Sequence, residues 1–258
     1  MGIRGRNSGT GEPRTNEHHT VTDWLVGTIT HVRTETPTGR SLTIAVDGWP
    51  GNLAGQHLDL RLTAPDGYQA VRSYSIASVG ADPSVQLAVD KIPTGEVSPY
   101  LVDDVLPGDQ LEVRGPLGRW FVWTPEDTRP IQLIAGGSGI VPLVAMARAH
   151  AASGSAVPFR LLYSVRSPQD RFFADEIAAL ESETFRVDLV YTRSTPEGWP
   201  TPAGRVTRDV IEALTLPASD APGVFVCGPT GFVEAVARSL VDLGHEPQNV
   251  KTERFGGS

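Results

Sequence analysis

A glycine-rich segment near the middle of the chain has the composition of a phosphate-binding loop. It reads Ala135-Gly136-Gly137-Ser138-Gly139-Ile140-Val141-Pro142, and Gly137, Gly139 and Pro142 are the candidate contacts. Glycines let the backbone approach a pyrophosphate, and the start of a helix offers free N–H groups. Pro142 suits the first helical turn, where an N–H has no intrahelical partner. The pattern also suits an ordinary strand–helix turn, but the lack of a following Gly-Lys-Ser/Thr excludes a Walker-type loop.

Donor side chains follow the next strands of the same half. Ser164 and Arg166 end the second expected strand, while Arg193 and Arg205 lie near the end of the third. An acidic residue at the end of the second strand would hold a ribose 2′-hydroxyl, whereas basic residues suit a 2′-phosphate. These positions fall on one edge of a parallel sheet, so they predict a phosphate contact. The alternative is that each arginine is a solvated surface charge.

A third group of residues lies in the first half of the chain, at Arg72-Ser73-Tyr74-Ser75. Strand alternation places Ser73 and Ser75 on one face and Arg72 and Tyr74 on the other. An arginine can clamp a diphosphate, and a tyrosine can lie along a flat ring. The alternative is an ordinary strand with a polar face.

Short alternating segments separated by turn residues position this third group. Closely spaced strands of this kind predict an antiparallel barrel or sandwich, with one helix near Val97–Asp103. The expected strands are Leu25–Val32, Leu42–Val46, His57–Leu62, Ser73–Ala77, Val85–Val89 and Leu111–Val113.

After Thr124–Pro130 the pattern changes to strands that alternate with helices. This alternation predicts a Rossmann-like parallel sheet with helices on its faces. The expected strands are Ile131–Ala135, Phe159–Ser164, Val187–Tyr191, Val224–Cys227 and Val250–Thr252, and the expected helices are Val141–Ala152, Asp170–Leu180, Val206–Leu214 and Phe232–Leu243. We therefore expect a disordered leader over residues 1–22, a barrel domain over 23–125 and an α/β domain over 130–258.

Composition narrows the classes of protein. The net charge of −8 makes a broad nucleic-acid surface improbable. Cys227 is alone, which excludes an internal disulfide and a cysteine-ligated cluster, and no His-x-x-x-His pair supports a metal site. No apolar run reaches the length of a membrane helix, and residues 1–22 lack the apolar core of a signal peptide, so we expect a cytoplasmic protein.

Several motifs, in their order along the chain, resemble those of the ferredoxin–NADP reductase-type flavoproteins. The resemblance covers roughly Trp24 to Phe255. It is carried by Gly55-Gln56, Arg72-x-Tyr74-Ser75, Gly95-Glu96-Val97-Ser98, Pro107-Gly108-Asp109, Gly115-Pro116-Leu117-Gly118, Gly136-Gly137-x-Gly139-x-x-Pro142, Cys227-Gly228-Pro229 and Glu253-Arg254-Phe255. It implies an N-terminal Greek-key barrel that binds FAD and a C-terminal domain that binds NAD(P).

The resemblance implies roles on the flavin side. Arg72 would bind the FAD pyrophosphate, Tyr74 would pack on the flavin and Ser75 would lie near flavin N5. The turn from Gly95 to Ser98 favours FAD over FMN. The further flavin-site residues implied are Ser73, Val89, Lys91, Gly95, Val97 and Ser98.

On the nicotinamide side, Cys227 would approach the nicotinamide C4, with Gly228 and Pro229 beside it. A buried structural thiol is a compatible alternative for Cys227. Glu253 would support proton and hydride traffic, and Phe255 would cover the flavin until the nicotinamide displaces it. The sequence departs from the plant pattern here, because Gly256-Gly257-Ser258 follow the aromatic residue. Arg166, Arg193 and Arg205 match positions that contact the 2′-phosphate in bacterial members, which favours NADP(H) over NAD(H).

The implied activity is hydride transfer from NADPH to FAD, followed by electron transfer to an external acceptor. We expect a separate ferredoxin or flavodoxin as acceptor, because no cluster domain is present in the chain. Alternatives are direct reduction of a small acceptor (a ferric complex, a quinone or free flavin) and a flavin-binding subunit without hydride chemistry. We expect a monomer without nucleic-acid or membrane partners. The candidate docking residues for an acidic carrier are Arg40, Arg61, Arg119 and Arg254.

Overall fold

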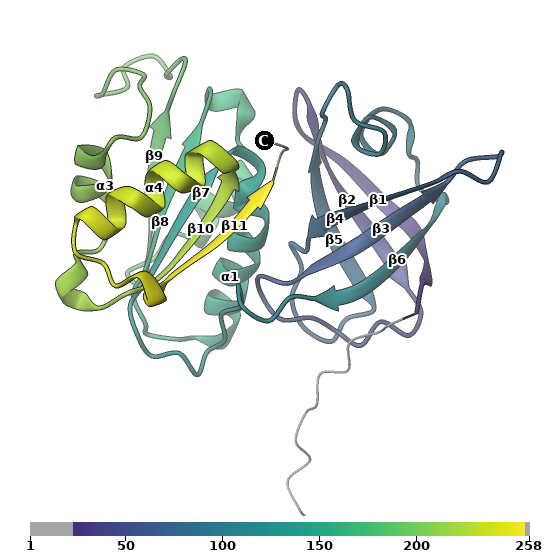
Figure 1. The fold of residues 1–258 in the computed structure, drawn as a ribbon, viewed down its shortest axis with the longest axis horizontal. Helices are drawn as coiled ribbons and strands as arrows, with labels where there is room; N and C mark the ends of the chain where they lie inside the picture. The colour runs from purple at the N-terminus through teal and green to yellow at the C-terminus, as the bar shows by residue number, and fades with distance from the viewer. Residues whose placement is uncertain (1–22, 256–258) are drawn as a thin grey trace, which may run out of the picture.

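The first half of the chain folds into a six-stranded antiparallel sheet that curls into a barrel (Figure 1). The computed structural model describes residues 23–255, so the expected leader over 1–22 and Gly256-Gly257-Ser258 lie outside the described residues. The strands are β1 Leu25–Thr36, β2 Gly39–Val46, β3 His57–Thr63, β4 Gln69–Ser75, β5 Ser84–Asp90 and β6 Gln110–Leu117. All six expected strands are confirmed: five have longer bounds, whereas the strand expected at Ser73–Ala77 begins earlier and ends at Ser75.

The barrel has the strand order β4-β3-β6-β1-β2-β5, and a bridge between Ile76 and Leu87 joins its two ends. The non-sequential place of β6, between β3 and β1, agrees with the Greek-key expectation. Alternate residues along the strands point inward, as Leu58 and Leu60 on β3 do, and both are fully buried.

The helix predicted at Val97–Asp103 is confirmed. Helical residues begin at Ser98 and end in the short π-helix η1, Tyr100–Asp104. The Ile92 N–H donates to the Ser98 hydroxyl at 3.0 Å, which holds the preceding residues in a turn. The observed bounds differ from the predicted ones by one residue at each end.

The second half is a parallel sheet with the order β11-β10-β7-β8-β9. Figure 1 shows helices covering it. Buried apolar clusters place α1 and α2 on one face, and α3 and α4 on the other. The strands are β7 Ile131–Gly136, β8 Phe159–Val165, β9 Phe185–Tyr191, β10 Gly223–Pro229 and β11 Val250–Phe255; the helices are α1 Ile140–Ser153, α2 Ala174–Leu180, α3 Arg208–Leu214 and α4 Thr230–Asp242.

Helix α2 begins four residues later than the predicted Asp170–Leu180. Phe173 has φ +54°, which no α-helix accommodates, and the Phe172 N–H donates to the Tyr163 hydroxyl at 3.1 Å. A tertiary contact of this kind is invisible to a periodicity argument, so the sequence placed the helix start too early.

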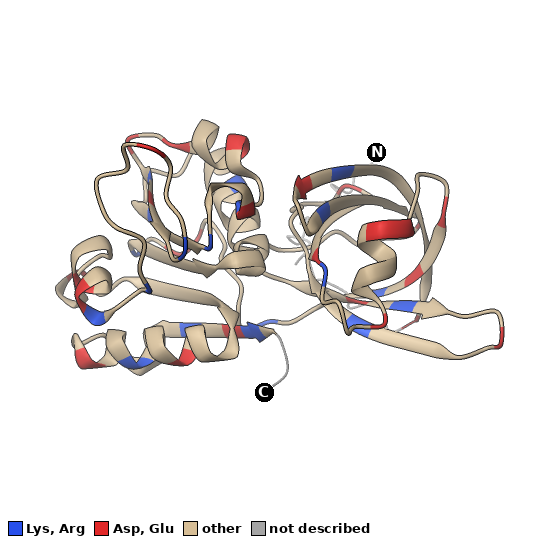
Figure 2. Ribbon diagram, turned by 90° about the horizontal axis from the view of Figure 1, so that it is seen from above, with Lys and Arg blue, Asp and Glu red and all other residues tan. Residues whose placement is uncertain are grey.

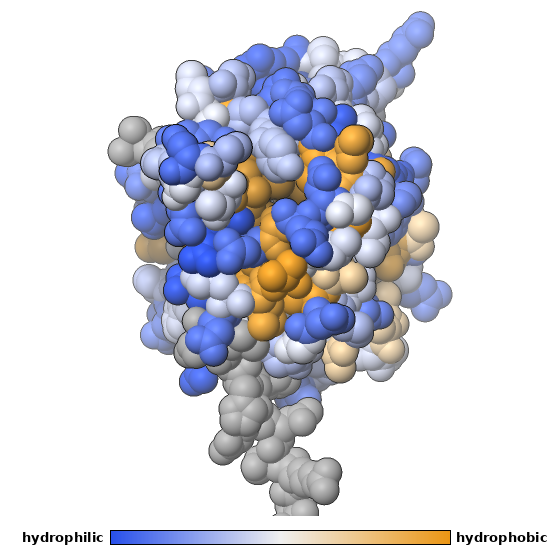
Figure 3. Space-filling model, turned by 90° about the vertical axis from the view of Figure 1, so that its right-hand side faces the viewer, coloured by the Kyte–Doolittle hydropathy of each residue, from blue (hydrophilic) through white to orange (hydrophobic). Residues whose placement is uncertain are grey.

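The two halves share one apolar core. Ala54, Ala77 and Ala88 of the barrel half belong to the same buried cluster as α1 and the inner face of the parallel sheet. Acidic and basic positions are interspersed over both halves (Figure 2). The far end of the barrel exposes apolar side chains (Figure 3), and Val26, Tyr68, Tyr100 and Leu106 are among the exposed apolar residues of this half. Within residues 23–255, no helix combines the length and apolarity needed to cross a bilayer.

Gly55 provides a test of the junction between the halves. It has φ +97°, and a Cβ there would overlap the Phe121 carbonyl and approach Met146 of α1. We expect Gly55→Ala to lower the free energy of unfolding by about 3 kcal/mol, because a backbone penalty adds to a steric clash. Gly67 is the matched control, since it has φ +88° but open space around its Cβ. Gly67→Ala should cost only about 1 kcal/mol, and equal losses in urea unfolding would contradict the clash.

Candidate active site

The strand order of the parallel sheet reverses between β7 and β10, which creates a crevice at their carboxyl ends. Parallel α/β sheets bind ligands at such a switch point. The predicted loop Gly137–Gly139 leaves β7 here, and Cys227-Gly228-Pro229 ends β10. The two motifs, about 90 residues apart in the sequence, are therefore neighbours at one edge of the sheet.

Glycines make this close approach possible. A Cβ on Gly139 would overlap the Cys227 carbonyl, and a Cβ on Gly228 would lie 2.8 Å from the Phe232 ring. Gly137 has φ +56° with open space beside it, so its backbone is accessible to a ligand. Pro142 lies in the first turn of the 14-residue helix α1, as predicted. The loop is thus a cradle of bare backbone beneath a helix N-terminus, which suits a dinucleotide phosphate.

A cavity of about 230 Å³ lies between the halves at this edge. It brings together several of the predicted residues, and the barrel half contributes to its wall as well. The predicted residues that line it are Gly137, Ser164, Arg166, Pro229 and Phe255, and the barrel residues are Thr36, Thr38 and Asp90. Arg193 and Arg205 are exposed and do not line the cavity, although the Arg193 N–H donates to the Arg166 carbonyl at 2.9 Å.

The cavity also contains Asp170, which the sequence analysis missed. Its carboxylate accepts a hydrogen bond from Ser167 at 2.5 Å. A carboxylate beside Arg166 adds a group that can bind a ribose hydroxyl. It lies four residues after Arg166, in the short 3-10 helix Pro168–Asp170, where no rule about strand ends would have selected it.

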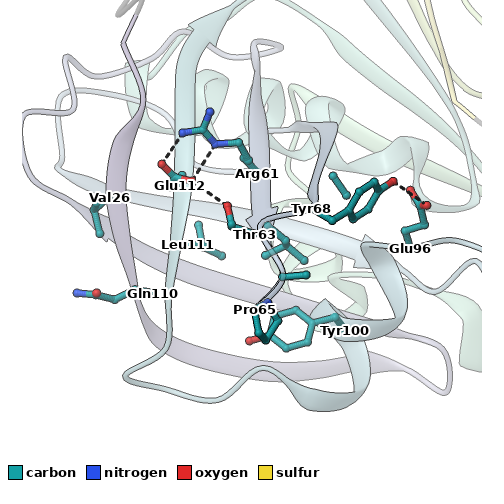
Figure 4. Close-up of a pocket in the computed structure, with 13 residues that line it drawn as sticks. Val26, Arg61, Thr63, Pro65, Tyr68, Glu96, Tyr100, Gln110, Leu111 and Glu112 are labelled. Carbon is teal, nitrogen blue, oxygen red and sulfur yellow. Dashed lines mark hydrogen bonds and ion pairs between the residues drawn. The ribbon is translucent and has the colours of Figure 1, made fainter.

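On the barrel, Arg72 already holds an anion. Its guanidinium donates to the Glu96 carboxylate at 2.8 Å. The Tyr68 hydroxyl donates to the other oxygen of Glu96 at 3.0 Å, and Figure 4 shows this second bond. Glu96 belongs to the predicted Gly95–Ser98 turn, so the structure brings the strand motif and the turn motif together. The cavity drawn in Figure 4, of about 660 Å³, includes Glu96 and Tyr68 but none of the predicted catalytic residues.

The other predicted flavin-side residues differ in what they can offer. Val89 and Val97 are core side chains, so only their backbones can face a ligand. Lys91 pairs with Asp103 at 3.1 Å, and Ser98 is buried within its turn. Burial raises the pKa of Tyr74 to about 12, although the charge of Arg72 opposes this, so the phenol stays protonated.

Ser73 and Ser75 share a face of β4, as alternation predicted. Ser73 donates to Asp59 at 2.7 Å, and Arg114 donates to the same carboxylate at 2.6 Å. Burial alone would raise the pKa of Asp59, but these two hydrogen bonds outweigh it and hold the pKa below its ordinary value. Asp59 is therefore a fixed anion beside the serine face.

His57 is a second residue that the sequence analysis missed. It pairs with Ser75 across β3 and β4, and its Nδ1 lies 3.9 Å from the Glu253 carboxyl on β11. Burial lowers the pKa of His57, opposed by Asp59, and burial raises the pKa of Glu253 to about 7. Burial thus disfavours the charged form of each group: His57 is mainly neutral near pH 7, and Glu253 is about half protonated there. The signal was present, because His57 directly follows the Gly55-Gln56 motif.

Glu253 pairs in turn with Cys227 in the parallel sheet. Cys227 is almost fully buried, and burial, reinforced by Glu253, raises the pKa of its thiol well above the ordinary value. The thiol is thus a neutral, compact group rather than a nucleophilic thiolate. Ser75, His57, Glu253 and Cys227 form a continuous row of neighbours that crosses from the barrel to the parallel sheet.

The candidate docking arginines are not brought together in the same way. Arg61 forms an ion pair with Glu112 at 2.5 Å beneath the Trp24 ring. Arg254 lies on the opposite face of β11 from Glu253, because adjacent strand residues alternate. Arg119 is exposed, and Arg40 lies on β2.

These features fit two nucleotides. The Arg72 guanidinium, which binds a carboxylate here, suits the diphosphate of one nucleotide. The exposed backbone of the Gly137–Gly139 loop suits the diphosphate of the other. A barrel with such an anion site, joined to a parallel sheet with such a loop at its switch point, defines the class of flavin- and nicotinamide-dependent oxidoreductases.

Comparison with known proteins agrees with this class. Residues 48–122 match the family described as oxidoreductase FAD-binding domain, and residues 133–238 match the oxidoreductase NAD-binding domain. The chain belongs to the ferredoxin reductase-like family of oxidoreductases.

Individual relatives show the range of this family. The chain is 34% identical to NADH-cytochrome b5 reductase 1 of Aspergillus oryzae, over 74% of this chain and 68% of the relative. It is 30% identical to the toluate 1,2-dioxygenase electron transfer component of Pseudomonas putida, over 80% of this chain but only 59% of the relative's length. The FAD/NAD-binding domain of nitric oxide dioxygenase from Vibrio cholerae superposes with a TM-score of 0.80 at 23% identity, covering 90% of this chain and 99% of that domain, and shows the shared fold.

The buried carboxyl of Glu253 predicts a pH-dependent stability. Its pKa in the folded protein, about 7, lies above the ordinary 4.5. Its contribution to the free energy of unfolding is therefore fully present below pH 4.5 and is lost as the pH rises through 7. We expect the free energy of unfolding of Glu253→Gln, taken relative to that of wild type, to be about 2–3 kcal/mol higher at pH 8 than at pH 5.

Urea unfolding at both pH values measures this difference. Glu234→Gln, at an exposed site on α4, is the matched control and should show no change between pH 5 and pH 8 relative to wild type. A Glu253→Gln variant that tracks wild type at both pH values would show that this carboxyl titrates normally.

Proposed function

We propose that this protein transfers a hydride from NADPH to FAD and passes the electrons on to a separate carrier protein, a ferredoxin or flavodoxin. The observation that carries the proposal is the row Ser75–His57–Glu253–Cys227. It joins the strand of the flavin motif to the strand of the nicotinamide motif across the interface of the two halves. The roles assigned to these residues are part of the proposal.

FAD, when bound, supplies a centre that accepts a hydride and releases electrons singly. Arg72 would bind its diphosphate in place of the Glu96 carboxylate, and Tyr74 and Ser75 would contact its ring. The neutral thiol of Cys227 would face the nicotinamide without reacting with it. Glu253 and His57 would hold one proton between them at the edge of the site, since burial disfavours charge on both groups.

The preference for NADPH is supported by Arg166 and Ser164 in the cavity. Arg193 and Arg205 would have to swing towards a 2′-phosphate, because neither lines the cavity. Asp170 is the observation that favours the second candidate, NADH, since a carboxylate suits an unmodified ribose. Several relatives are named as NADH-dependent reductases, which supports the same alternative.

A carrier protein as acceptor is supported by the relative named as an electron transfer component of a dioxygenase. The alternative acceptor is a small molecule such as a ferric complex, a quinone or free flavin. Passive flavin binding has less support, because binding alone requires neither Cys227 nor Glu253. A cytoplasmic location and a monomeric state remain predictions from the sequence.

The first experiment is anaerobic rapid mixing of the flavin-loaded protein with NADPH or NADH. The absorbance of the oxidised flavin at about 450 nm is followed over time. We expect bleaching by both, about tenfold faster with NADPH, and loss of this preference in Arg166→Ala. Arg186→Ala, on β9 outside the cavity, is the control and should keep the preference. Faster bleaching by NADH would favour the Asp170 alternative, and no bleaching would favour passive binding.

Phe255 offers a test of the stacking role. Its ring is 37% exposed and lines the cavity, where it would cover the flavin. We expect Phe255→Ala to tighten nicotinamide binding several-fold and to reduce the discrimination between NADPH and NADH, because no ring has to be displaced. Phe255→Tyr should behave like wild type. Unchanged kinetics of Phe255→Ala with both nucleotides would remove Phe255 from the mechanism.

A further inference from the structure

Arg148, in the second half of α1, contacts both halves of the molecule. Its Nε and Nη2 donate to the two oxygens of Glu176 on α2, at 2.6 and 2.7 Å. Its Nη1 donates to the Ala77 carbonyl at 2.8 Å and to the Gln86 side chain at 2.7 Å, both in the barrel half. The guanidinium also lies 5.2 Å from the centre of the Phe173 ring. One side chain thus joins two helices of the parallel-sheet half to the barrel.

One of the barrel groups that Arg148 binds, the Ala77 carbonyl, is close in sequence to Ser75 of the flavin motif. Ala77 lies two residues after Ser75, directly beyond the strand that carries the flavin motif. At its other end, α1 starts immediately after the Gly137–Gly139 loop. Helix α1 therefore links the nucleotide loop to the barrel half through the Arg148 guanidinium as well as through apolar contacts.

A second polar contact crosses the interface at Glu35 of β1. Its side chain is 3% exposed and accepts hydrogen bonds from Ser41 at 2.7 Å and from the Phe173 N–H at 3.1 Å. Phe173 directly precedes α2, the helix that carries Glu176. Both polar contacts therefore meet at α2, one at its start and one within it.

We propose that Arg148 and Glu35 are positioning residues that fix the distance between nicotinamide and flavin. The inference rests on the proposed function. Apolar packing between the halves is non-directional and tolerates sliding, whereas charged hydrogen bonds fix angle and register. Hydride transfer needs this fixed register, since a misplacement of about 1 Å can cost roughly 100-fold in rate.

The test compares Arg148→Met, Gln86→Met and Glu35→Gln with a matched control, Arg160→Met. Arg160 is about as buried as Arg148 and forms an ion pair with Asp188 at 2.8 Å, but both residues of this pair belong to the parallel sheet. We expect the limiting rate of flavin reduction to fall about tenfold in Arg148→Met and a few-fold in Gln86→Met and Glu35→Gln. The dissociation constant of the nucleotide should change by less than about threefold, since its binding residues are intact.

Two readouts other than rate separate positioning from general destabilisation. The long-wavelength absorbance that arises when nicotinamide stacks on flavin should weaken in the interface variants and persist in Arg160→Met. In the protein without added nucleotide, hydrogen exchange at the amides of Ala77 and Phe173 should accelerate about tenfold in Arg148→Met and remain unchanged in Arg160→Met.

Interface variants that match Arg160→Met in rate, absorbance and exchange would overturn the inference while leaving the proposed function intact. A wild-type protein whose flavin is not reduced by either nucleotide would overturn the proposed function and this inference with it. If Arg148→Met does not fold, Gln86→Met decides, because it removes one neutral acceptor and leaves the pair between Arg148 and Glu176 in place.

Discussion

The burial of helix α1 between the parallel sheet and the barrel is the constraint on which the rest of the structure depends. Nine of its residues are buried, and seven of them belong to one cluster with residues of both halves. Because this helix begins at the nucleotide loop, its position determines where that loop lies relative to the barrel. The apolar contacts hold the two halves together, whereas the few polar contacts across the interface are directional and restrict how the halves are oriented.

The centre of the interface is notable for how little charge it carries. Burial disfavours the charged forms of His57, Glu253 and Cys227. Asp59, two residues after His57 on β3, remains an anion. Groups that burial keeps close to neutral avoid placing an unpaired charge in this apolar region, where such a charge would be costly. This arrangement follows from burial at the junction of two sheets.

The strands and the phosphate loop were predictable because they depend on local patterns. Alternation identified all six barrel strands, and continuous apolar runs identified the parallel ones. The start of α2 was wrong, because Phe173 takes a positive φ where Glu35, distant in the sequence, accepts its N–H. His57 and Asp170 were missed since their importance comes from contacts made only after folding. Strand order predicts the edge of the sheet where a residue lies but not where its side chain points. Arg193 and Arg205 follow strands or precede helices at the predicted edge, but their side chains do not line the cavity.

Strand β11 forms an outer edge of the parallel sheet in the described residues, so one side of its backbone has no partner strand. Exposed edges of this kind invite another chain to add a strand and so to aggregate. Lys251 and Arg254 place two positively charged side chains along this strand, and charged residues on an edge strand discourage such pairing. The strand that carries Glu253, a residue of the proposed redox site, thus also has an edge that disfavours strand addition. Substitutions chosen only to alter the chemistry at this edge therefore also change the colloidal behaviour of the whole molecule.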